Sequence, residues 1–556
     1  MDRLIGGGPT PESVEAPRAR TRTVGELLTD LALDSPHAQA IVSPHGDRTF
    51  AELDGQSEQV AAALLAAGVR KGDVVALLAP NTPTWLEVMA GAARIGAVIV
   101  PLNTWYKDDE IRWVLRHSHA KVLISVDRVR NQDLHASIGR VAPSVEQPYA
   151  EQSNGRLTDP NVPDLERIVA LGERRHRGSL SYDEFLDAGT AALDLVAEHA
   201  ASVTPEDPLY LLYTSGSTAR PKGVLLLHGY ALENAWHIGQ RQGVEPVDRT
   251  WLVQPLFWAL GGVNMLFSSW THGSSVVLQD VFDAEEGLRT IERYGATRAY
   301  AIGNISQALL AHPYFPDADL TTLRKGVALF SPADRRIASE RLGMDIFVSI
   351  YGSTEMHAVS FSENFSSPLE ERLASNGTTL PGWEAQLVRP GTDERVHDGE
   401  GELVVRGRLS PGYFEDLEQT AAAFDADGWF HTGDLVSVDE FGRLEFLARI
   451  TEMIKTGGIN VAPPEVEDVL ARCPGVRSAH VFAMPDPVKG EVVAAVVVPD
   501  GPRAVTPASV RDWVAGRAAA YKVPARVVLA DEDQLPRLPT GKIAKRRLHE
   551  LMGKEA

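Results

Sequence analysis

Short apolar segments alternate with helical segments along most of this chain, and that alternation is its strongest constraint on the fold. Ser57–Val69 has helical spacing with small residues, and Asp73–Pro80 predicts a buried strand. Thr84–Leu102 predicts a helix that continues through Gly96 into a strand, and Ala120–Val126 predicts another strand. These strands are apolar throughout, which favours parallel sheets covered by helices on both faces. We therefore expect an α/β fold built from layered α/β/α sheets.

The pattern changes after Trp429, where turns with Gly and Pro lead into an amphipathic helix, two strands, a further helix and a basic C-terminus. Such a set of elements predicts a small α+β domain that follows the large one. We expect a flexible tail over residues 1–22, a large N-terminal domain over 23–448, a hinge over 449–452 and a small C-terminal domain over 453–556.

The composition excludes several classes of protein. A chain of 556 residues is long enough for more than one core. The net charge of −21 argues against binding to nucleic acid, which needs clustered Lys and Arg. The single Cys473 excludes an internal disulfide framework and a cysteine-rich zinc site. No apolar window approaches the ~18 residues of a membrane span, so we expect a cytoplasmic protein.

The segment Leu211–Gly229, LLYTSGSTARPKGVLLLHG, has a basic loop rich in hydroxyl groups between two apolar runs. Gly216 and Gly223 allow the backbone to approach a ligand closely, and Lys222 supplies a compact cation. The combination predicts a phosphate cradle on a turn from a strand to a helix. It is not a P-loop, because Gly223 follows Lys222 where that motif has a Ser or Thr; a plain surface loop is the alternative. The hydroxyl and glycine residues of the expected cradle are Thr214, Ser215, Gly216, Ser217 and Thr218.

Seven ordered motifs resemble those of the adenylate-forming superfamily, and in particular its acyl-CoA synthetase and aryl-CoA ligase branch. They are YTSGSTARPKG (Tyr213–Gly223), PLFWALGG (Pro255–Gly262), YGSTE (Tyr351–Glu355), GELVVRG (Gly401–Gly407), TGDL (Thr432–Leu435), ARITEMIKTGGINVAPPEVE (Ala448–Glu467) and LPTGKIAKRRL (Leu538–Leu548). The resemblance implies a small mobile C-terminal domain and a two-step reaction. A carboxylate attacks the α-phosphate of ATP to give an acyl-adenylate and pyrophosphate, and a thiol, usually that of CoA, then displaces AMP.

The resemblance also implies how the phosphates are held. Lys222 and the loop hydroxyls would bind the β- and γ-phosphates, and Lys542 would reach the carboxylate and the α-phosphate. Glu355 and Thr218 would hold Mg²⁺, a hard cation that prefers oxygen ligands. The first step needs charge neutralisation rather than a covalent enzyme intermediate, and these residue types meet that need.

Other residues are expected, by the same resemblance, to bind the nucleoside part of ATP. Tyr351 would stack on adenine, and Asp434 would bind both ribose hydroxyls, for which a carboxylate is suited. Arg449 would contact the ribose or a phosphate near the hinge. Gly352 and Thr354 complete this expected set.

The second step is expected to use another face of the small domain. Gly457 and Gly458 would let the pantetheine arm of CoA pass close to the backbone. Lys455 and Asn460 match positions that act in the thioester-forming arrangement of the family. At the hinge the family usually has Asp or Lys, whereas this chain has Thr451.

The acyl pocket implied by the resemblance has Trp258 as an aromatic gate between the acid and the thiol. Its other expected residues are Ala259, Gly261, Gly262, Gly303, Phe330, Ser331 and Ile350. Most are small or apolar, the glycine pair leaves volume, and no charged side chain among them would pair with an amino acid. We therefore expect a hydrophobic, bulky or ring-containing carboxylic acid.

Three positions depart from the family pattern. Ala219 replaces a glycine of the loop, Phe330–Pro332 replace a small segment against adenine, and Ile350 is bulkier than usual. A Cβ at Ala219 costs ~1 kcal/mol where positive φ is needed. Two interpretations stay open: a complete ligase with a reshaped pocket, or an enzyme that only converts a preformed acyl-adenylate to the thioester. A loader of a separate carrier protein and a non-catalytic nucleotide or acyl sensor are further alternatives.

Overall fold

The computed structural model describes most of the chain, and the chain forms two compact units. The described residues are 22–148, 156–214, 221–301, 303–329, 332–396, 399–456, 459–461, 463–486, 489–501, 505–518, 520–537 and 543–553. Apart from Arg22, the tail expected over residues 1–22 lies outside them. Among the described residues, the larger unit contains Arg22–Glu384 together with Arg406–Phe430, and the smaller unit contains Ala385–Val405 and the chain from His431 on.

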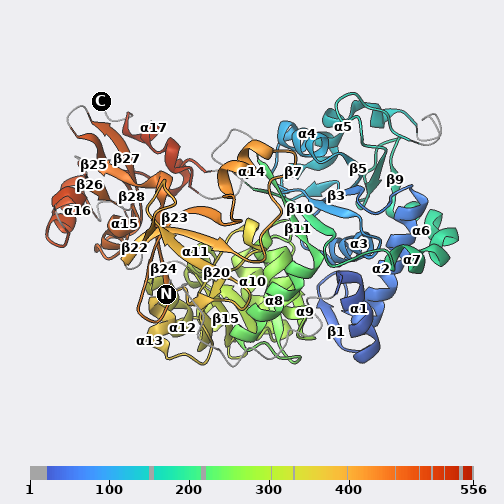
Figure 1. Ribbon diagram of the computed structural model, residues 1–556, viewed down its shortest axis with the longest axis horizontal. Helices are drawn as coiled ribbons and strands as arrows, with labels where there is room; N and C mark the ends of the chain where they lie inside the picture. Colours follow the sequence, from blue (N-terminus) through green and yellow to red (C-terminus); the bar gives the residue numbers. More distant parts are fainter. Residues whose placement is uncertain are drawn as a thin grey trace. The chain divides into compact units, whose positions relative to one another are not determined.

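The larger unit contains a first seven-stranded sheet in the order β11-β10-β4-β3-β5-β8-β9 (Figure 1). Its strands are β3 (Val74–Leu78), β4 (Val98–Pro101), β5 (Ala120–Ser125), β8 (Arg167–Ala170), β9 (Leu180–Ser181), β10 (Pro208–Thr214) and β11 (Lys222–Leu227). Neighbouring strands are parallel from β10 to β9, and only β11 at the edge runs antiparallel to its neighbour. All five residues of β3 are buried, as the uninterrupted apolar run predicted.

Helices cover this sheet, and the strand order explains why they cover both faces. The chain leaves β3 for β4 on one side and then crosses to β5 on the other side of β3. Because crossover connections are right-handed, α3 and α4 are placed on opposite faces. The helices around the sheet are α1 (Val24–Asp34), α2 (Phe50–Ala66), α3 (Pro83–Arg94), α4 (Asp108–His117), α5 (Leu134–Val141), α6 (Tyr182–Gly189) and α7 (Leu193–Ala200). Helix α2 packs on α3, so α3 is almost entirely buried.

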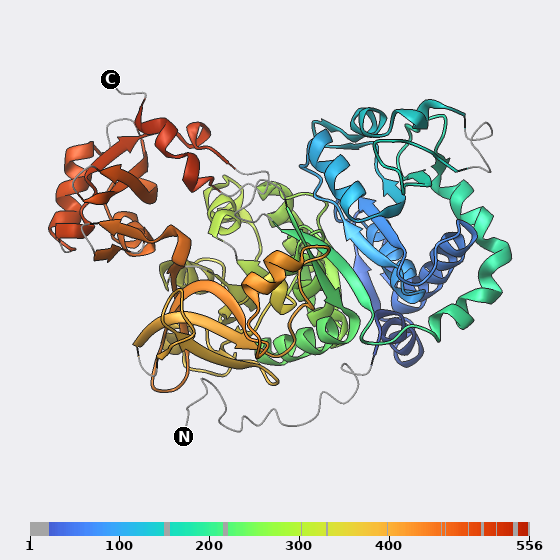
Figure 2. The same ribbon diagram turned by 45° about the horizontal axis from the view of Figure 1, so that its top comes forward.

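A second seven-stranded sheet has the order β16-β15-β14-β12-β13-β1-β2 and is parallel except for the β1–β2 pair. Figure 2 shows the part of the chain that forms most of it in green to yellow. Its strands are β1 (Gln39–Val42), β2 (Arg48–Thr49), β12 (Arg249–Leu252), β13 (Ser275–Leu278), β14 (Arg298–Ala301), β15 (Lys325–Ala328) and β16 (Ile346–Val348). The helices between β11 and β16 in the chain are α8 (His228–Gln242), α9 (Leu266–Trp270), α10 (Ala284–Tyr294), α11 (Gly303–Ala311) and α12 (Pro332–Glu340). After β16 come α13 (Leu369–Ala374) and α14 (Leu417–Ala423). Beside them, β17 (Ile350–Tyr351), β18 (Phe361–Ser362) and β19 (Thr378–Thr379) form a short antiparallel sheet.

The smaller unit is built from two further sheets. One has the order β21-β20-β22-β23-β24, formed by β20 (Glu384–Val388), β21 (Arg395–Val396), β22 (Gly399–Arg406), β23 (Phe430–Val438) and β24 (Leu444–Arg449). The other contains β25 (Ile454–Thr456), β26 (Ile459–Val461), β27 (Val476–Asp486), β28 (Gly490–Pro499) and β29 (Arg526–Leu529). Helices α15 (Pro463–Ala471) and α16 (Pro507–Ala515) pack on this second sheet, and α17 (His549–Met552) follows near the C-terminus.

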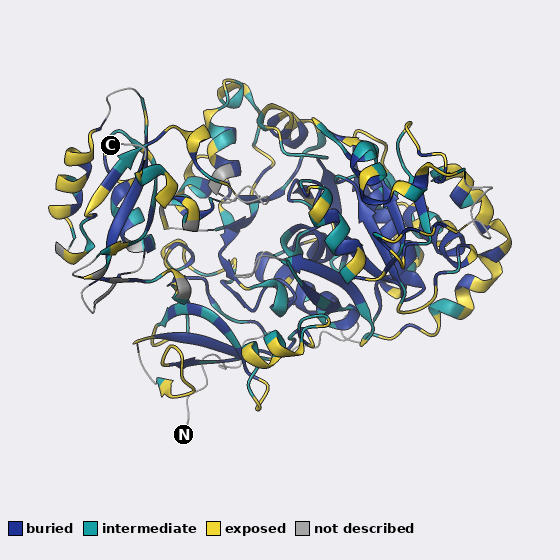
Figure 3. Cartoon of the chain, turned by 90° about the horizontal axis from the view of Figure 1, so that it is seen from above, coloured by how far each residue is buried: buried dark blue, intermediate teal, exposed yellow. Residues whose placement is uncertain are grey.

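Burial follows the layered arrangement within each unit. Buried residues run along the strands, and exposed residues lie on the outer sides of helices (Figure 3). The expected α/β architecture, with a large N-terminal and a small C-terminal part, is confirmed. Within the described ranges, none of the helices combines the length and the apolar character that crossing a membrane requires.

Candidate active site

The hydroxyl-rich segment comes, in the sequence, between two strands that pair with each other. Strands β10 and β11 are antiparallel, and Thr214 lies opposite Lys222 in their register. Helix α8 begins only at His228, so the prediction of a turn from a strand to a helix was wrong. The apolar residues after Lys222 pair with β10 before the chain turns into the helix, which is why a strand intervenes. The loop residues Ser215, Gly216, Ser217, Thr218 and Ala219 lie outside the described residues.

A third segment lies against the start of β11. The backbone N–H of Phe414 donates to the carbonyl oxygen of Gly223 at 2.8 Å, and Tyr413 forms a bridge with Val224. A Cβ at Gly223 would lie 2.9 Å from Cδ1 of Leu211 and 3.3 Å from Cβ of Phe414. Glycine at this position therefore allows the segment around Tyr413 to reach the base of the loop.

Tyr413 contacts two predicted site residues at once. Its hydroxyl donates to Oε1 of Glu355 at 2.9 Å, and Nζ of Lys222 lies 4.7 Å from the centroid of its ring. The backbone N–H of Ser410 also donates to the carbonyl oxygen of Glu355 at 2.8 Å. The structure thus brings together Lys222 and Glu355, the predicted phosphate and Mg²⁺ residues. All three side chains are half-buried, which leaves them accessible to a ligand.

Sequence reasoning missed Tyr413. Its local signal is weak: a tyrosine after Gly412 in a polar segment, shortly after the GELVVRG motif. The contact depends on pairing between segments distant in the chain, which local patterns do not report.

The turn that carries Glu355 is set by close backbone packing. Thr354, Glu355 and Met356 form a single 3₁₀ turn, followed by left-handed backbone at His357 with φ of 51°. A Cβ at Gly352 would lie 2.3 Å from the carbonyl oxygen of Ala358. Only glycine lets the two arms of the turn approach this closely, and the approach fixes the direction in which Glu355 leaves the backbone.

The ring of His357 locks the same turn to its neighbours. Its Nε2 accepts from the N–H of Leu227 at 2.9 Å, so Nδ1 carries the proton and donates to the carbonyl oxygen of Arg408, also at 2.9 Å. Complete burial lowers the pKa of His357 to about 3, because the charged form would lose its hydration. A neutral imidazole therefore joins β11, the Glu355 turn and the segment that leads to Tyr413.

Tyr351, predicted to stack on adenine, is buried in β17, and its ring packs edge-on against Phe361 with centroids 6.0 Å apart. Ile350 beside it is also buried, and its carbonyl oxygen accepts from Nδ2 of Asn376 at 3.1 Å. Of the other residues expected around the base and the acid, Gly303 begins α11. Phe330 and Ser331 lie outside the described residues.

Trp258 belongs to an aromatic cluster at the start of a π-helix (Ala259–Met265). Its ring meets Trp105 and Phe257 edge-on, with centroids 5.3 and 5.4 Å apart. A Cβ at Gly261 would lie 2.4 Å from the carbonyl oxygen of Pro255, and one at Gly262 would lie 2.1 Å from that of Leu256. The glycine pair therefore accommodates backbone, and its missing side chains do not by themselves leave volume for a ligand as the sequence suggested.

In the smaller unit, Asp434 and Arg449 form an ion pair between Oδ1 and Nε at 2.8 Å. They lie opposite each other on β23 and β24, and the carboxylate is buried. The alternation of β23 places Asp434 on its buried side, and the paired strand supplies the arginine. The two predicted ribose residues are thus neighbours.

The predicted thioester-forming residues lie on the β25–β26 hairpin. Lys455 lies opposite Asn460 in its register. Gly457 and Gly458, expected at the pantetheine arm, lie outside the described residues, as does Lys542. Of the residues on either side of Lys542 in the sequence, Arg537 and Ile543 form an antiparallel bridge.

The residues present fit a Mg²⁺ ion that is held largely by substrate phosphates. Among the described residues, no group of three or more His, Cys, Asp and Glu side chains could hold a metal. Glu355 offers a half-buried carboxylate with one oxygen fixed by Tyr413. Mg²⁺ commonly binds through one or two carboxylates together with phosphates, so this donor set is sufficient.

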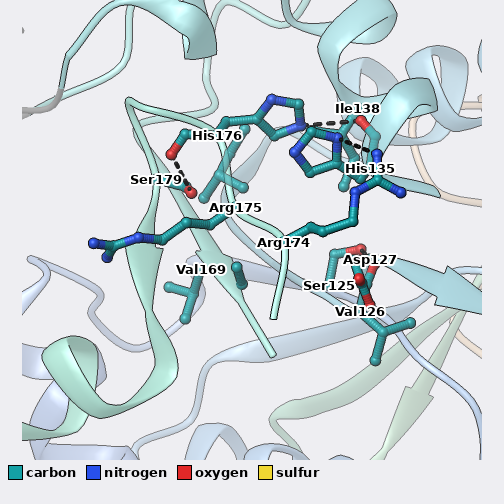
Figure 4. Close-up of a pocket in the computed structure, with 12 residues that line it drawn as sticks. Ser125, Val126, Asp127, His135, Ile138, Val169, Arg174, Arg175, His176 and Ser179 are labelled. Carbon is teal, nitrogen blue, oxygen red and sulfur yellow. Dashed lines mark hydrogen bonds between the residues drawn. The ribbon is translucent and has the colours of Figure 1, made fainter. Parts of the chain in front are cut away.

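A separate small cavity lies at the carboxyl ends of β5 and β8 (Figure 4). Its volume is about 10 Å³, enough for one water molecule. The rings of His135 and His176 stack in its wall with centroids 3.8 Å apart, and Nη2 of Arg174 lies 3.2 Å from Nδ1 of His135. His176 is paired with Glu146 at 2.7 Å. None of these residues was predicted to act in catalysis, and the cavity is too small for an organic substrate.

Comparison with known families decides the identity of the chain. The AMP-binding enzyme family matches residues 29–414, and its C-terminal domain matches residues 465–542. The chain belongs to the AMP-binding enzyme family. This adenylate-forming enzyme is an AMP-forming acid–thiol ligase of the acyl-CoA synthetase branch, which confirms the resemblance of the seven motifs.

Relatives match over almost the whole length of the adenylate-forming enzyme. It is 32% identical to the putative acyl-CoA synthetase YngI of Bacillus subtilis, over 95% of this chain and 96% of the relative. It is 34% identical to the 3-[(3aS,4S,7aS)-7a-methyl-1,5-dioxo-octahydro-1H-inden-4-yl]propanoyl:CoA ligase of Mycobacterium tuberculosis, over 95% and 99%. The crystal structure of the anthranilate CoA ligase AuaEII with anthranoyl-AMP has a TM-score of 0.81 at 28% identity, over 95% and 97%.

Proposed function

We propose that this enzyme is a complete acyl-CoA ligase, which makes an acyl-adenylate from a carboxylic acid and ATP and then transfers the acyl group to CoA. The observation that carries the proposal is the contact of Lys222 and Glu355 with one tyrosine at the base of the hydroxyl-rich loop. A cation and a carboxylate held together beside a loop of hydroxyls suit a nucleotide triphosphate better than a neutral ligand.

In the first step a carboxylate oxygen of the acid bonds to the α-phosphorus, and the bond to the β-phosphate oxygen breaks to release pyrophosphate. Lys222 and the hydroxyls of Thr214, Ser215, Ser217 and Thr218 neutralise and orient the departing phosphates. Lys542 orients the acid carboxylate against the α-phosphate. Glu355, with Thr218, would hold Mg²⁺, which when bound neutralises phosphate charge.

The nucleoside is held by Asp434 through its ribose hydroxyls and by Tyr351 against adenine. Arg449, paired with Asp434 at 2.8 Å, orients that carboxylate. The contacts to adenine and ribose do not take part in bond breaking. They position the α-phosphate for in-line attack, and positioning supplies much of the catalysis in such a step.

In the second step the thiol of CoA loses its proton, its sulfur bonds to the acyl carbon, and the bond from that carbon to AMP breaks. We infer that the small domain over residues 453–556 turns about a hinge at residues 449–452 between the two steps, as such transitions commonly do. Gly457 and Gly458 would then admit the pantetheine arm, with Lys455 and Asn460 beside it.

We infer that the acid is hydrophobic and bulky or ring-containing. The relative from Mycobacterium tuberculosis is named for a bicyclic propanoyl substrate, and the neighbour of known structure binds an aromatic acid as its adenylate. The aromatic cluster of Trp105, Phe257 and Trp258 supports an apolar gate at the pocket.

A second candidate function is an enzyme that catalyses only the thioester step and not adenylation. The observation that favours it is Ala219, which replaces a glycine of the loop. Two assays on the purified protein separate the two, across a panel of aromatic, fatty and polycyclic acids. ATP–pyrophosphate exchange reports adenylation. Acyl-CoA formation is followed from acid plus ATP and, separately, from synthetic acyl-adenylate.

We expect exchange with at least one cyclic acid and a CoA ester from that acid plus ATP. Ester formation from the adenylate without exchange would overturn the complete ligase, and Ala219→Gly would then restore exchange if the Cβ is the cause. Exchange without ester formation on CoA would point to the thiol of a carrier protein.

A further inference from the structure

Tyr413 has a position that its local sequence does not explain. Its backbone N–H donates to Oγ1 of Thr420 at 2.9 Å, and Thr420 in turn donates to the carbonyl oxygen of Asp416 at 2.7 Å. Gly412 just before it has φ of 137°, and a Cβ there would lie 2.6 Å from Cγ2 of Thr420. The start of α14 therefore fixes the backbone of Tyr413 from one side, and β11 fixes it from the other.

A tyrosine held in this way presents two different surfaces to two different charges. Its hydroxyl donates to one oxygen of Glu355. Because this hydrogen bond fixes the carboxylate, it also fixes the direction of the other carboxylate oxygen. The face of its ring lies within cation–π range of the Lys222 ammonium, which restricts a long and flexible side chain. Both charges are set in place before a ligand arrives, and such preorganisation is what phosphate chemistry needs.

We propose that Tyr413 is a positioning residue for the adenylation step, acting through Glu355 on Mg²⁺ and through Lys222 on the phosphates of ATP. The inference rests on the proposed roles of Lys222 and Glu355. It assigns no bond-making role to the phenol. Its effect is confined to the nucleotide and metal, so the thioester step from preformed acyl-adenylate does not depend on it.

The chain offers a matched control in Tyr314. Its hydroxyl donates to Oε2 of Glu292 at 2.6 Å, and Cζ of Arg289 lies 4.2 Å from its ring centroid. Tyr314 thus has the same two kinds of contact as Tyr413, one to a carboxylate and one to a cation. None of the residues at Tyr314 has a proposed role in the reaction.

The experiment compares the full-length wild type with Tyr413→Phe, Tyr413→Leu and Tyr314→Phe. Binding of a non-hydrolysable ATP analogue is measured by calorimetry across a Mg²⁺ series. ATP–pyrophosphate exchange and ester formation from synthetic acyl-adenylate are measured on the same preparations.

We expect Tyr413→Phe to raise the Mg²⁺ concentration for half-maximal nucleotide binding by roughly 3–10-fold, the loss of one hydrogen bond to a charged group. High Mg²⁺ should restore binding in Tyr413→Phe but not in Tyr413→Leu, where Lys222 has also lost its ring. Ester formation from the adenylate and all properties of Tyr314→Phe should match the wild type.

An unchanged Mg²⁺ dependence in Tyr413→Phe would overturn the inference, and so would an equal loss in both half-reactions, because a merely structural role predicts that loss. Calorimetry also separates the inference from the proposed function. Mg²⁺-dependent binding that weakens in Tyr413→Phe, without exchange on any acid, would support the inference and overturn the complete ligase. A wild type that binds no nucleotide with Mg²⁺ would overturn both. Tyr413→Phe alone decides the question if Tyr413→Leu fails to fold.

Discussion

The Nε atom of Arg449 lies 2.8 Å from Oδ1 of Asp434, and the two residues also face each other across β23 and β24. The side chain of Asp434 is 5% exposed, whereas that of Arg449 is 49% exposed. Nη1 of Arg449 also donates to the carbonyl oxygen of Thr432 at 2.9 Å, which fixes the guanidinium beside the carboxylate. A buried carboxylate needs such a partner to remain charged at acceptable cost.

Arg449→Met should lower the free energy of unfolding by about 1–3 kcal/mol, because it leaves the Asp434 carboxylate buried without its cation. Asp434→Asn keeps the shape and removes the charge, so it should cost less stability and weaken ATP binding instead. Urea unfolding and nucleotide titration measure the two effects. Arg472→Met is the control in the same unit, since its exposed pair with Asp468 on α15 should contribute less than about 0.5 kcal/mol. Equal stability losses in Arg449→Met and Arg472→Met would contradict the argument.

Gly352→Ala should damage the Glu355 turn. The new Cβ would lie 2.3 Å from the carbonyl oxygen of Ala358 and 2.5 Å from Cα of Val359, so the backbone must shift. We expect a loss of about 1–3 kcal/mol in stability and weaker Mg²⁺-dependent ATP binding.

Gly55→Ala is the matched control for this change. Gly55 lies inside α2, and a Cβ there would meet nothing within 4 Å. Because alanine favours the helix, this variant should be more stable than the wild type by about 0.5–1 kcal/mol. Thermal unfolding of the two variants side by side checks both signs, and a neutral Gly352→Ala would show that the turn relaxes freely.

His357 should make the enzyme less stable as the pH falls. Burial lowers its folded-state pKa to about 3, whereas an unfolded histidine titrates near ~6.5. Between these values the unfolded chain binds a proton that the folded chain does not. The free energy of unfolding therefore falls with decreasing pH, by at most about 1.4 kcal/mol per pH unit from this group, and is unaffected by it above pH ~7.

His357→Asn tests this contribution, because asparagine tolerates the left-handed backbone found there. The variant should be less stable than the wild type at neutral pH, since two hydrogen bonds are lost, yet its stability should decline less steeply between pH 6.5 and 4. Urea titrations at a series of pH values give both slopes. Parallel slopes would mean that other buried histidines, such as His228, dominate the acid response.

Sequence patterns predicted the layered fold where burial alone decides the outcome, as in the fully buried strand Val74–Leu78. The patterns failed where the structure depends on contacts between separate segments of the chain. The apolar run after Lys222 was taken to lead directly into a helix, but its residues complete a hairpin with β10. Gly261 and Gly262 suggested an open pocket, whereas their missing side chains make room for the backbone of Pro255 and Leu256. Such contacts between segments have no signature in composition or periodicity.

The guanidinium of Arg298, in the second sheet, is fully buried. Nε and Nη2 of Arg298 on β14 donate to Oε1 of Gln242 at 2.9 and 2.6 Å. Its other N–H groups donate to hydroxyl oxygens, those of Thr250, Ser268, Ser269 and Tyr300. Complete burial lowers the pKa of Arg298, because the charged form loses its hydration. The acceptors of these hydrogen bonds are all neutral.

Arg298→Met should therefore destabilise the enzyme by about 2–4 kcal/mol, because it leaves the Gln242 oxygen and several hydroxyls buried without a donor. Arg298→Lys keeps the charge but cannot reproduce the planar fork, so it should be destabilising as well. The exposed Arg289, paired with Glu285 at 2.8 Å, provides the control Arg289→Met, which should change stability by less than about 0.5 kcal/mol. Chemical unfolding ranks the three variants. If Arg298→Lys were as stable as the wild type, charge rather than the forked geometry would be what this network requires.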